Sequence, residues 1–152
     1  MPQYILDDYV SRGQDCNIWV TQPRRIAALS VAERVSSYRA KSTGLASWGQ
    51  IGKIVGYQIG LEKKVSRDTR ITYMTPAIVS NKMRSDPALK EVTVLIIDEV
   101  HERDLETEML LLLVKNLLNS ESTIKVLLMS ATINATDYRD YLGNLIISIS
   151  IN

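Results

Sequence analysis

The sequence predicts an α/β fold with a doubly wound, mainly parallel β-sheet. Short apolar runs alternate with segments of helical periodicity, which is typical of strands joined by crossover helices. The run at residues 92–97 is apolar apart from Thr93 and rich in β-branched residues, which indicates a strand buried on both faces. Ligands of such sheets bind at the carboxyl ends of the strands, so the residues after each strand are the first functional candidates.

The first half of the chain supplies two helices, three strands and a loop. Residues 2–10 have helical periodicity, and Asn-Ile-Trp-Val-Thr at 17–21 is β-rich. Pro23 suits the first turn of a helix that is expected to end near Tyr38. The apolar stripe predicted for this helix is Ile26, Leu29, Val31, Ala32 and Val35. Glycines and serines make residues 41–53 a predicted loop. Strands are expected at 54–59 and 70–74, separated by a charged turn at 62–68.

The second half repeats the alternation. Pro76 opens a short helix that the Ser-Asp-Pro sequence at 85–87 ends. Asp104 can cap a helix that spans residues 105–118. The remaining expected elements are a buried strand at 124–129, a helix at 134–142 and a strand at 145–151.

Composition limits the possible function classes. A chain of 152 residues suits one domain, and a net charge of +1 gives no bulk electrostatic attraction to nucleic acid. Any RNA contact must therefore come from a few placed residues. The single cysteine, Cys16, excludes an intramolecular disulfide and favours a reducing compartment, with the cytoplasm expected and the nucleus as the alternative. No apolar run is long enough to span a membrane, and the N-terminus does not have the pattern of a signal peptide.

Two adjacent carboxylates, Asp98 and Glu99, follow the predicted strand at 92–97. Successive side chains at a strand end point to opposite sides, so one carboxylate can face a divalent cation and the other a water molecule. P-loop ATPases use such a pair, in which the Asp holds Mg²⁺ and the Glu activates the attacking water. A solvated acidic turn is the alternative. His101 is the only histidine, so one His and one Cys cannot assemble a His/Cys zinc site.

Polar residues follow three other predicted strands. Ser130 and Thr132 can hydrogen-bond to the acidic turn, and Thr132 can also cap the next helix. Arg24 and Arg25 stand at a helix N-terminus, which offers either a phosphate site or a solvated helix start. Thr75 supplies one more hydroxyl at a helix start.

The phosphate-binding pattern G-x-x-x-x-G-K-[ST] occurs nowhere in the sequence. Gly49-Gln50-Ile51-Gly52-Lys53 has neither its spacing nor its final hydroxyl. We interpret this stretch as part of the loop at 41–53.

Five segments, in order, resemble the motifs of DEAH/RHA-type RNA helicases. They are Thr-Gln-Pro-Arg-Arg-Ile-Ala-Ala at 21–28, Val-Gly-Tyr-Gln-Ile-Gly-Leu-Glu at 55–62, Ile-Thr-Tyr-Met-Thr at 71–75, Leu-Ile-Ile-Asp-Glu-Val-His-Glu-Arg at 95–103 and Met-Ser-Ala-Thr-Ile at 129–133. The variant Asp-Glu-Val-His, with Gly60 where most relatives have Arg, is similar to the Tudor-containing germline helicases of the spindle-E type.

The resemblance implies a RecA-like (P-loop NTPase) domain that uses ATP and Mg²⁺ in an ATP-dependent RNA helicase. It implies that Asp98 binds Mg²⁺, that Glu99 activates the hydrolytic water and that His101 couples the nucleotide to a second RecA-like domain. Ser130 and Thr132 would link hydrolysis to strand movement, while Arg24 and Thr75 would contact the RNA backbone without reading its sequence. Germline granule proteins would be further partners if the chain is of the spindle-E type.

The same resemblance implies that residues 1–152 form a first RecA-like domain that is truncated at the N-terminus. Residues 2–6 are similar to the helix that follows the phosphate-binding loop in this family, so the loop and the strand before it are expected to be missing. Pro76-Ala77 also departs from the family pattern beside Thr75. Two alternatives remain: a catalytically inactive fragment that binds only RNA or a protein, and another RecA-like ATPase that acts on DNA.

Overall fold

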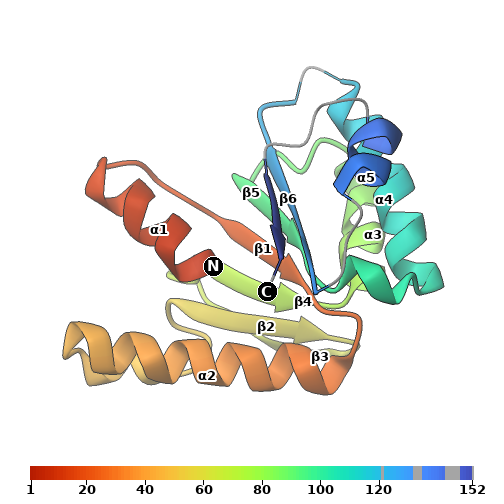
Figure 1. Ribbon diagram of the computed structural model, residues 1–152. Helices are drawn as coiled ribbons and strands as arrows, with labels where there is room; N and C mark the ends of the chain where they lie inside the picture. Colours follow the sequence, from red (N-terminus) through yellow and green to blue (C-terminus); the bar gives the residue numbers. More distant parts are fainter. Residues whose placement is uncertain (121, 132–134, 143–147, 152) are drawn as a thin grey trace.

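A computed structural model of the chain describes residues 1–120, 122–131, 135–142 and 148–151. These residues form a sheet with the strand order β3-β2-β4-β1-β5-β6-β7 (Figure 1). β2 and β3 pair antiparallel, and the other neighbouring strands are parallel. The strands are β1 (Ile18–Thr21), β2 (Val55–Ile59), β3 (Glu62–Lys64), β4 (Ile71–Met74), β5 (Val94–Ile97), β6 (Lys125–Ser130) and β7 (Ser148–Ile151). The predicted mainly parallel sheet is confirmed.

Helices cover both faces of this sheet. The α-helices are α1 (Pro2–Ser11), α2 (Arg25–Thr43), α3 (Pro76–Ser85), α4 (Leu105–Leu118) and α5 (Ala135–Leu142), with short 3₁₀ turns η1 (Ala46–Gly49) and η2 (Val100–Glu102). α1 and α2 lie on one face, and α3, α4 and α5 lie on the other (Figure 1). This arrangement is the doubly wound architecture. None of the helices that the structure describes is long and apolar enough to cross a membrane.

β5 shows why the two cores form. All four of its residues are buried, and successive side chains enter opposite cores. Val94 and Ile96 join the core beneath α1 and α2, whereas Leu95 and Ile97 join the core beneath α3 and α4. Because neither face of β5 meets solvent, all of its residues must be apolar, and this accounts for the near-continuous apolar run in the sequence.

The charged turn predicted at residues 62–68 is partly wrong, because its first three residues form β3. Glu62, Lys63 and Lys64 are all exposed, so this edge strand has no apolar alternation that a sequence pattern could detect. Backbone pairing with β2 and the left-handed Gly60, with φ of +54°, hold the hairpin together. The Tyr57 hydroxyl also donates a hydrogen bond to Glu62 Oε1 across it.

The predicted loop at residues 41–53 is shorter than expected because α2 continues to Thr43. Gly44, with φ of +71°, ends the helix in the left-handed conformation that favours glycine. The rest of the segment contains η1, which folds back onto α2, and the Ser36 hydroxyl donates to the Trp48 carbonyl oxygen at 3.2 Å. The segment is therefore attached to the helix that precedes it.

Candidate functional site

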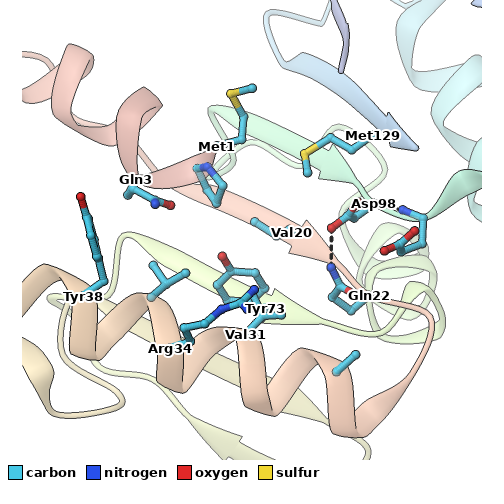
Figure 2. Close-up of a pocket in the computed structure, with 14 residues that line it drawn as sticks. Met1, Gln3, Val20, Gln22, Val31, Arg34, Tyr38, Tyr73, Asp98 and Met129 are labelled. Carbon is cyan, nitrogen blue, oxygen red and sulfur yellow. Dashed lines mark hydrogen bonds between the residues drawn. The ribbon is translucent and has the colours of Figure 1, made fainter. Parts of the chain in front are cut away.

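The carboxyl ends of β1 and β5 bring Gln22 and Asp98 together. The two strands pair in parallel up to Thr21 and Ile97, and the Asp98 N–H donates to the Thr21 carbonyl oxygen at 3.3 Å. Gln22 Nε2 donates to Asp98 Oδ2 at 2.5 Å, as Figure 2 shows. The backbone N–H of Glu99 donates to the other oxygen, Asp98 Oδ1, at 2.9 Å. Both carboxylate oxygens of Asp98 are thus held in place by the local fold.

A pocket of about 480 Å³ lies beside this carboxylate. The first residues of α1, the inner side of α2 and the ends of the central strands line it (Figure 2). Arg34 and Tyr38 reach into it from α2, and Tyr73 lies at its base on β4. Its volume is in the range of about 300–1,000 Å³ that is typical of small-molecule sites.

Burial and neighbouring charges shift the pKa values of two residues that line the pocket, Asp98 and Tyr73. Burial raises the pKa of the Asp98 carboxyl above its ordinary value, and the hydrogen bonds from Glu99 and Gln22 oppose part of that rise. Burial also raises the pKa of the Tyr73 hydroxyl; the negative charge of Asp98 adds to this effect, and Arg34 opposes it. The carboxylate of Asp98 is therefore in a partly desolvated position where a bound cation would stabilise its charge.

Glu99 adopts a backbone conformation that is uncommon for a residue with a side chain. Its φ of 57° and ψ of 34° lie in the left-handed region. Such conformations are retained where the surrounding structure enforces them, and they cluster at functional sites. Here the conformation turns the chain directly from β5 into η2, so that Glu99 lines the pocket beside Asp98.

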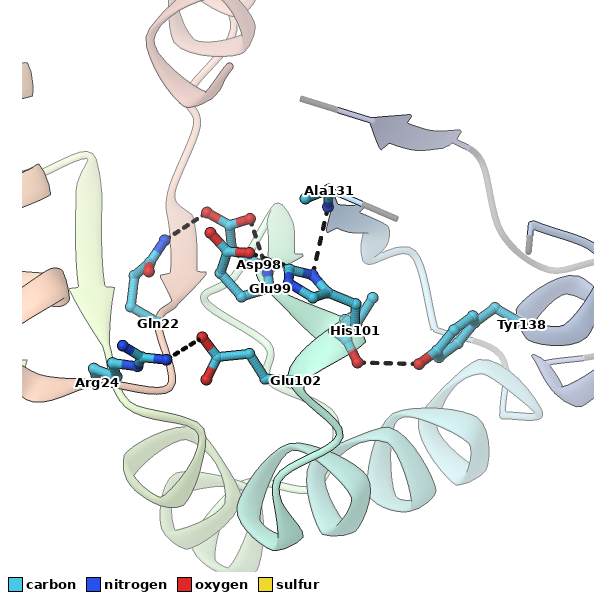
Figure 3. A network of polar contacts seen from close by, with 9 residues as sticks. Gln22, Arg24, Asp98, Glu99, His101, Glu102, Ala131 and Tyr138 are labelled. Atoms are coloured by element: carbon cyan, nitrogen blue, oxygen red, sulfur yellow. Dashed lines mark hydrogen bonds and ion pairs between the residues drawn. The ribbon is translucent and has the colours of Figure 1, made fainter. Parts of the chain in front are cut away.

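His101 lies between the acidic turn and the end of β6 (Figure 3). Its Nδ1 is 3.4 Å from Glu99 Oε2 and 3.4 Å from the backbone nitrogen of Ala131. One ring nitrogen cannot accept from the Ala131 N–H and donate to Glu99 at the same time. The position of the proton on the imidazole therefore decides whether His101 bonds to the β6 end or to the carboxylate.

The coupling residues Ser130 and Thr132 have different outcomes. Ser130 ends β6, is 1% exposed and precedes the Ala131 nitrogen that faces His101. Thr132 lies outside the described residues. Tyr138 of α5 adds a further connection, because its hydroxyl donates to the Val100 carbonyl oxygen at 3.1 Å (Figure 3).

The structure places the two predicted RNA-contacting residues at different depths. Arg24 immediately precedes α2, is exposed, and its Nη2 lies 2.9 Å from Glu102 Oε1 (Figure 3). Thr75 precedes α3 but is only 6% exposed, so its hydroxyl offers RNA little surface. Neither residue lines the pocket beside Asp98.

The donor set fits magnesium. Within the residues that the structure describes, no group of three or more His, Cys, Asp or Glu side chains is placed to hold a metal ion. Mg²⁺ is commonly bound by one or two carboxylates, with phosphate oxygens and waters as its other ligands. Asp98 and Glu99 are two carboxylates on one pocket. They suit a cation that arrives with a phosphate ligand.

The sequence profile of the DEAD/DEAH box helicases matches residues 4–141. The chain belongs to this family. The human ATP-dependent DNA/RNA helicase DHX36 is 46% identical over 145 residues, which cover 93% of this chain and 14% of that protein. The human ATP-dependent RNA helicase TDRD9 is 49% identical over 142 residues, or 93% of this chain and 10% of that protein.

A probable ATP-dependent RNA helicase spindle-E from Anopheles gambiae is 41% identical over 141 residues, or 93% of this chain and 9% of that protein. This helicase domain thus has relatives in the group that Asp-Glu-Val-His and Gly60 indicated, and the resemblance to DEAH-type helicases is confirmed. The chain spans between 9% and 14% of the length of these three relatives.

Sequence patterns did not single out Gln22, Arg34, Tyr38 or Tyr73 as individual site residues. Arg34 and Tyr38 are separated by four positions in the sequence, so they share one face of α2, and that spacing was the available signal. Tyr73 lies within an apolar strand, where an aromatic residue is ordinarily a core residue. Only the packing of α2 over β4 turns these side chains into the wall of one pocket.

Proposed function

We propose that this domain is the ATP-binding part of an RNA helicase, in which ATP hydrolysis drives movement along RNA. The observation that carries the proposal is the pair Asp98 and Glu99 at the end of β5, on a pocket of about 480 Å³. The names of the relatives, which include the words "ATP-dependent RNA helicase", support it. The ligand is proposed to be ATP with Mg²⁺.

In this proposal Asp98 holds the metal, and Gln22 and the Glu99 N–H fix the orientation of its carboxylate. Bound Mg²⁺ would neutralise charge that develops on the phosphates. Glu99 is proposed to orient a water molecule and accept its proton. The Glu99 side chain is 37% exposed, so water can reach it. His101 faces that carboxylate and is placed to hold it in position.

The coupling role is proposed for the contact between η2 and the end of β6. His101 reaches the Ala131 nitrogen, which directly follows Ser130. A change at Glu99 can therefore be transmitted to the segment that contains Ser130 and Thr132, and from there to a second RecA-like domain of the full-length protein. Because His101 Nδ1 lies within hydrogen-bonding distance of the Ala131 nitrogen, the two segments can be coupled by direct contact, without a chain of intervening residues.

Nucleotide binding is tested with Arg34, the cationic side chain that lines the pocket from α2. We expect Arg34→Ala to weaken the binding of a fluorescent ATP analogue about 10- to 100-fold, because hydrogen bonds to charged groups contribute about 1.5–3 kcal/mol. The measurement uses the domain with its phosphate-binding loop present. Arg12→Ala is the matched control, since Arg12 pairs with Asp8 on α1 and does not line the pocket. Equal affinities of the two variants would contradict the assignment of the pocket.

RNA binding is expected to be weak and to depend shallowly on salt. Arg24 is the exposed candidate, and each phosphate contact on a single strand contributes a slope of about 0.7 in a plot of log affinity against log salt. We expect Arg24→Ala to reduce the magnitude of this slope by about 0.7, which is the contribution of one phosphate contact. Fluorescence anisotropy with a labelled single strand measures the slope. A slope that implies many contacts, or one that the substitution leaves unchanged, would exclude the role of Arg24.

A further inference from the structure

A second pocket, of about 410 Å³, lies at the end of the sheet opposite to Asp98. Its residues Ile54 and Arg70 directly precede β2 and β4, whereas Gln22 and Asp98 directly follow β1 and β5. The amino and carboxyl ends of parallel strands lie at opposite edges of a sheet. The two pockets share no lining residue, so the second is a separate site.

The segment that contains η1 builds one wall of this pocket. Ser47 and Trp48 line it from η1, and Lys53 lines it from the following turn. This is the part of the predicted 41–53 loop that the family resemblance leaves without a role. Two hydrogen bonds hold the segment in place: Ser36 of α2 donates to the Trp48 carbonyl oxygen at 3.2 Å, and Thr69 Oγ1 donates to the Gly52 carbonyl oxygen at 3.0 Å. The wall is thus a formed structure.

Cations outnumber carboxylates among the lining residues. Arg39, Lys53 and Arg70 contribute three positive charges, and Asp68 contributes the single negative charge. Lys53 and Asp68 are 3.9 Å apart and both well exposed, so water screens their attraction. Arg70 directs Nη1 to the backbone carbonyl oxygens of Arg67 and Thr69. The charge of its guanidinium is therefore not neutralised by a carboxylate among the residues that the structure describes.

Arg39 is the most unusual of these cations because it is 5% exposed. One nitrogen, Nη1, lies 2.9 Å from Asp7 Oδ1, and its guanidinium carbon lies 5.5 Å from the centre of the Trp48 ring. Its Nε is buried and has no hydrogen-bond partner among the described residues. A buried donor without a partner is costly and calls for an explanation such as a bound ligand or water.

Apart from Ser47, the remaining lining residues are apolar or aromatic: Leu6, Val10, Trp48 and Ile54. A site with an aromatic and aliphatic wall beside clustered cations fits a ligand that combines an anionic group with a planar, weakly polar ring. Arginine suits phosphate oxygens in particular, and indole rings provide surfaces on which nucleobases stack.

We propose that this pocket binds a nucleoside phosphate, with the base against Trp48 and the phosphate against Lys53 and Arg70. The source is either a free nucleotide or one unit of an RNA single strand. This binding does not require the proposed ATP hydrolysis, because none of the residues involved lines the pocket beside Asp98.

The test uses the 152-residue chain with Trp19→Phe, which leaves Trp48 as the only tryptophan. We expect AMP to change the Trp48 emission saturably, with a dissociation constant of about 1 mM or lower. Adenosine and inorganic phosphate, each of which supplies half of the interaction, are expected to bind at least about tenfold more weakly. A flat titration with AMP, or equal binding of AMP and adenosine, would overturn the proposal.

Variants locate the site. Lys53→Gln and Arg70→Gln are each expected to weaken AMP binding about tenfold, because each removes one cation from the phosphate side. Lys41→Gln, an exposed lysine of α2 outside the pocket, is the matched control and is expected to bind like the parent. Circular dichroism checks that each variant is folded. Unchanged binding by folded Lys53→Gln and Arg70→Gln would refute the assignment.

Binding of oligoadenylate distinguishes a free nucleotide from an RNA single strand as the ligand. Tighter binding of the oligomer than of AMP would identify an RNA strand as the ligand, and binding of AMP alone would identify a free nucleotide. If AMP binding at Trp48 fails while Arg34→Ala still weakens ATP binding, this proposal fails and the proposed function stands. If AMP binds at Trp48 but Arg34→Ala leaves ATP binding unchanged, this proposal stands and the assignment of ATP to the pocket beside Asp98 fails.

Discussion

Replacing Glu99 with Gln is expected to lower RNA-stimulated ATP turnover about 10²- to 10⁴-fold, the usual contribution of a general base. The substitution retains the size of the side chain and removes its capacity to accept a proton from water. Asp98 and its hydrogen bonds from Gln22 and the residue-99 backbone N–H remain in place, so nucleotide affinity should change little. The measurement is steady-state phosphate release by a domain that contains the phosphate-binding loop and is joined to its second RecA-like domain.

Glu106→Gln is the matched control for this experiment. Glu106 is an exposed carboxylate in the first turn of α4, close in sequence to Glu99 but outside the pocket. We expect its turnover to equal that of the unaltered protein. If Glu99→Gln also left turnover unchanged, Glu99 would not be the water-activating residue, and the role inferred for the acidic pair would be incorrect.

The parts of the fold that could be predicted are those in which burial dictates the sequence. β5 enters two cores, so nearly all of its positions are apolar and the strand is evident. Asp104 likewise fixed the start of α4, where its carboxylate accepts from the Thr107 N–H at 3.0 Å. β3 was not predicted because its stability comes from backbone pairing, which leaves no trace in side-chain type.

The pattern of burial along helix α2 is a second feature that could not be predicted from the sequence. Its predicted stripe included Ile26, which is 80% exposed, and omitted Arg39, which is 5% exposed. Periodicity assigns an arginine to the solvent side, yet the tertiary structure buries this one beside Asp7 and Trp48. An ion pair between a buried arginine and an exposed aspartate 32 positions away cannot be inferred from one helix alone.

The candidate site was predictable where its residues follow strands. Asp98, Glu99 and Ser130 were singled out for that reason, and the sheet brings them to one edge. The wall formed by Arg34, Tyr38 and Tyr73 was not, because it depends on how α2 crosses β4. The low exposure of Thr75 was also unforeseeable, since it results from packing around the start of α3.

A polypeptide of these 152 residues is expected not to hydrolyse ATP. P-loop catalysis depends on loop amides, on a Lys at the β- and γ-phosphates and on a Ser or Thr at Mg²⁺. The sequence contains no segment with the spacing of that loop. Among the described residues that line the pocket, the positive groups are Arg34 and the α-amino group of Met1, and the carboxylates of Asp98 and Glu99 balance their charge. The charges of the pocket therefore do not attract a triphosphate, and Asp98 alone would hold Mg²⁺ only weakly.

Isothermal titration with a non-hydrolysable ATP analogue, together with a phosphate-release assay in the presence of RNA, measures both parts of this expectation. The same residues preceded by a phosphate-binding loop serve as the positive control. The titrations use Arg70→Gln in both proteins, so that the second pocket contributes little binding. We expect no resolvable heat of binding and no phosphate release above background from the 152-residue polypeptide, whereas the extended chain should bind the analogue. Micromolar affinity or clear turnover by the shorter polypeptide that carries Arg70→Gln would mean that its phosphate site lies neither beside Asp98 nor in the second pocket. The inferred roles of Asp98 and Glu99 would then have to be abandoned.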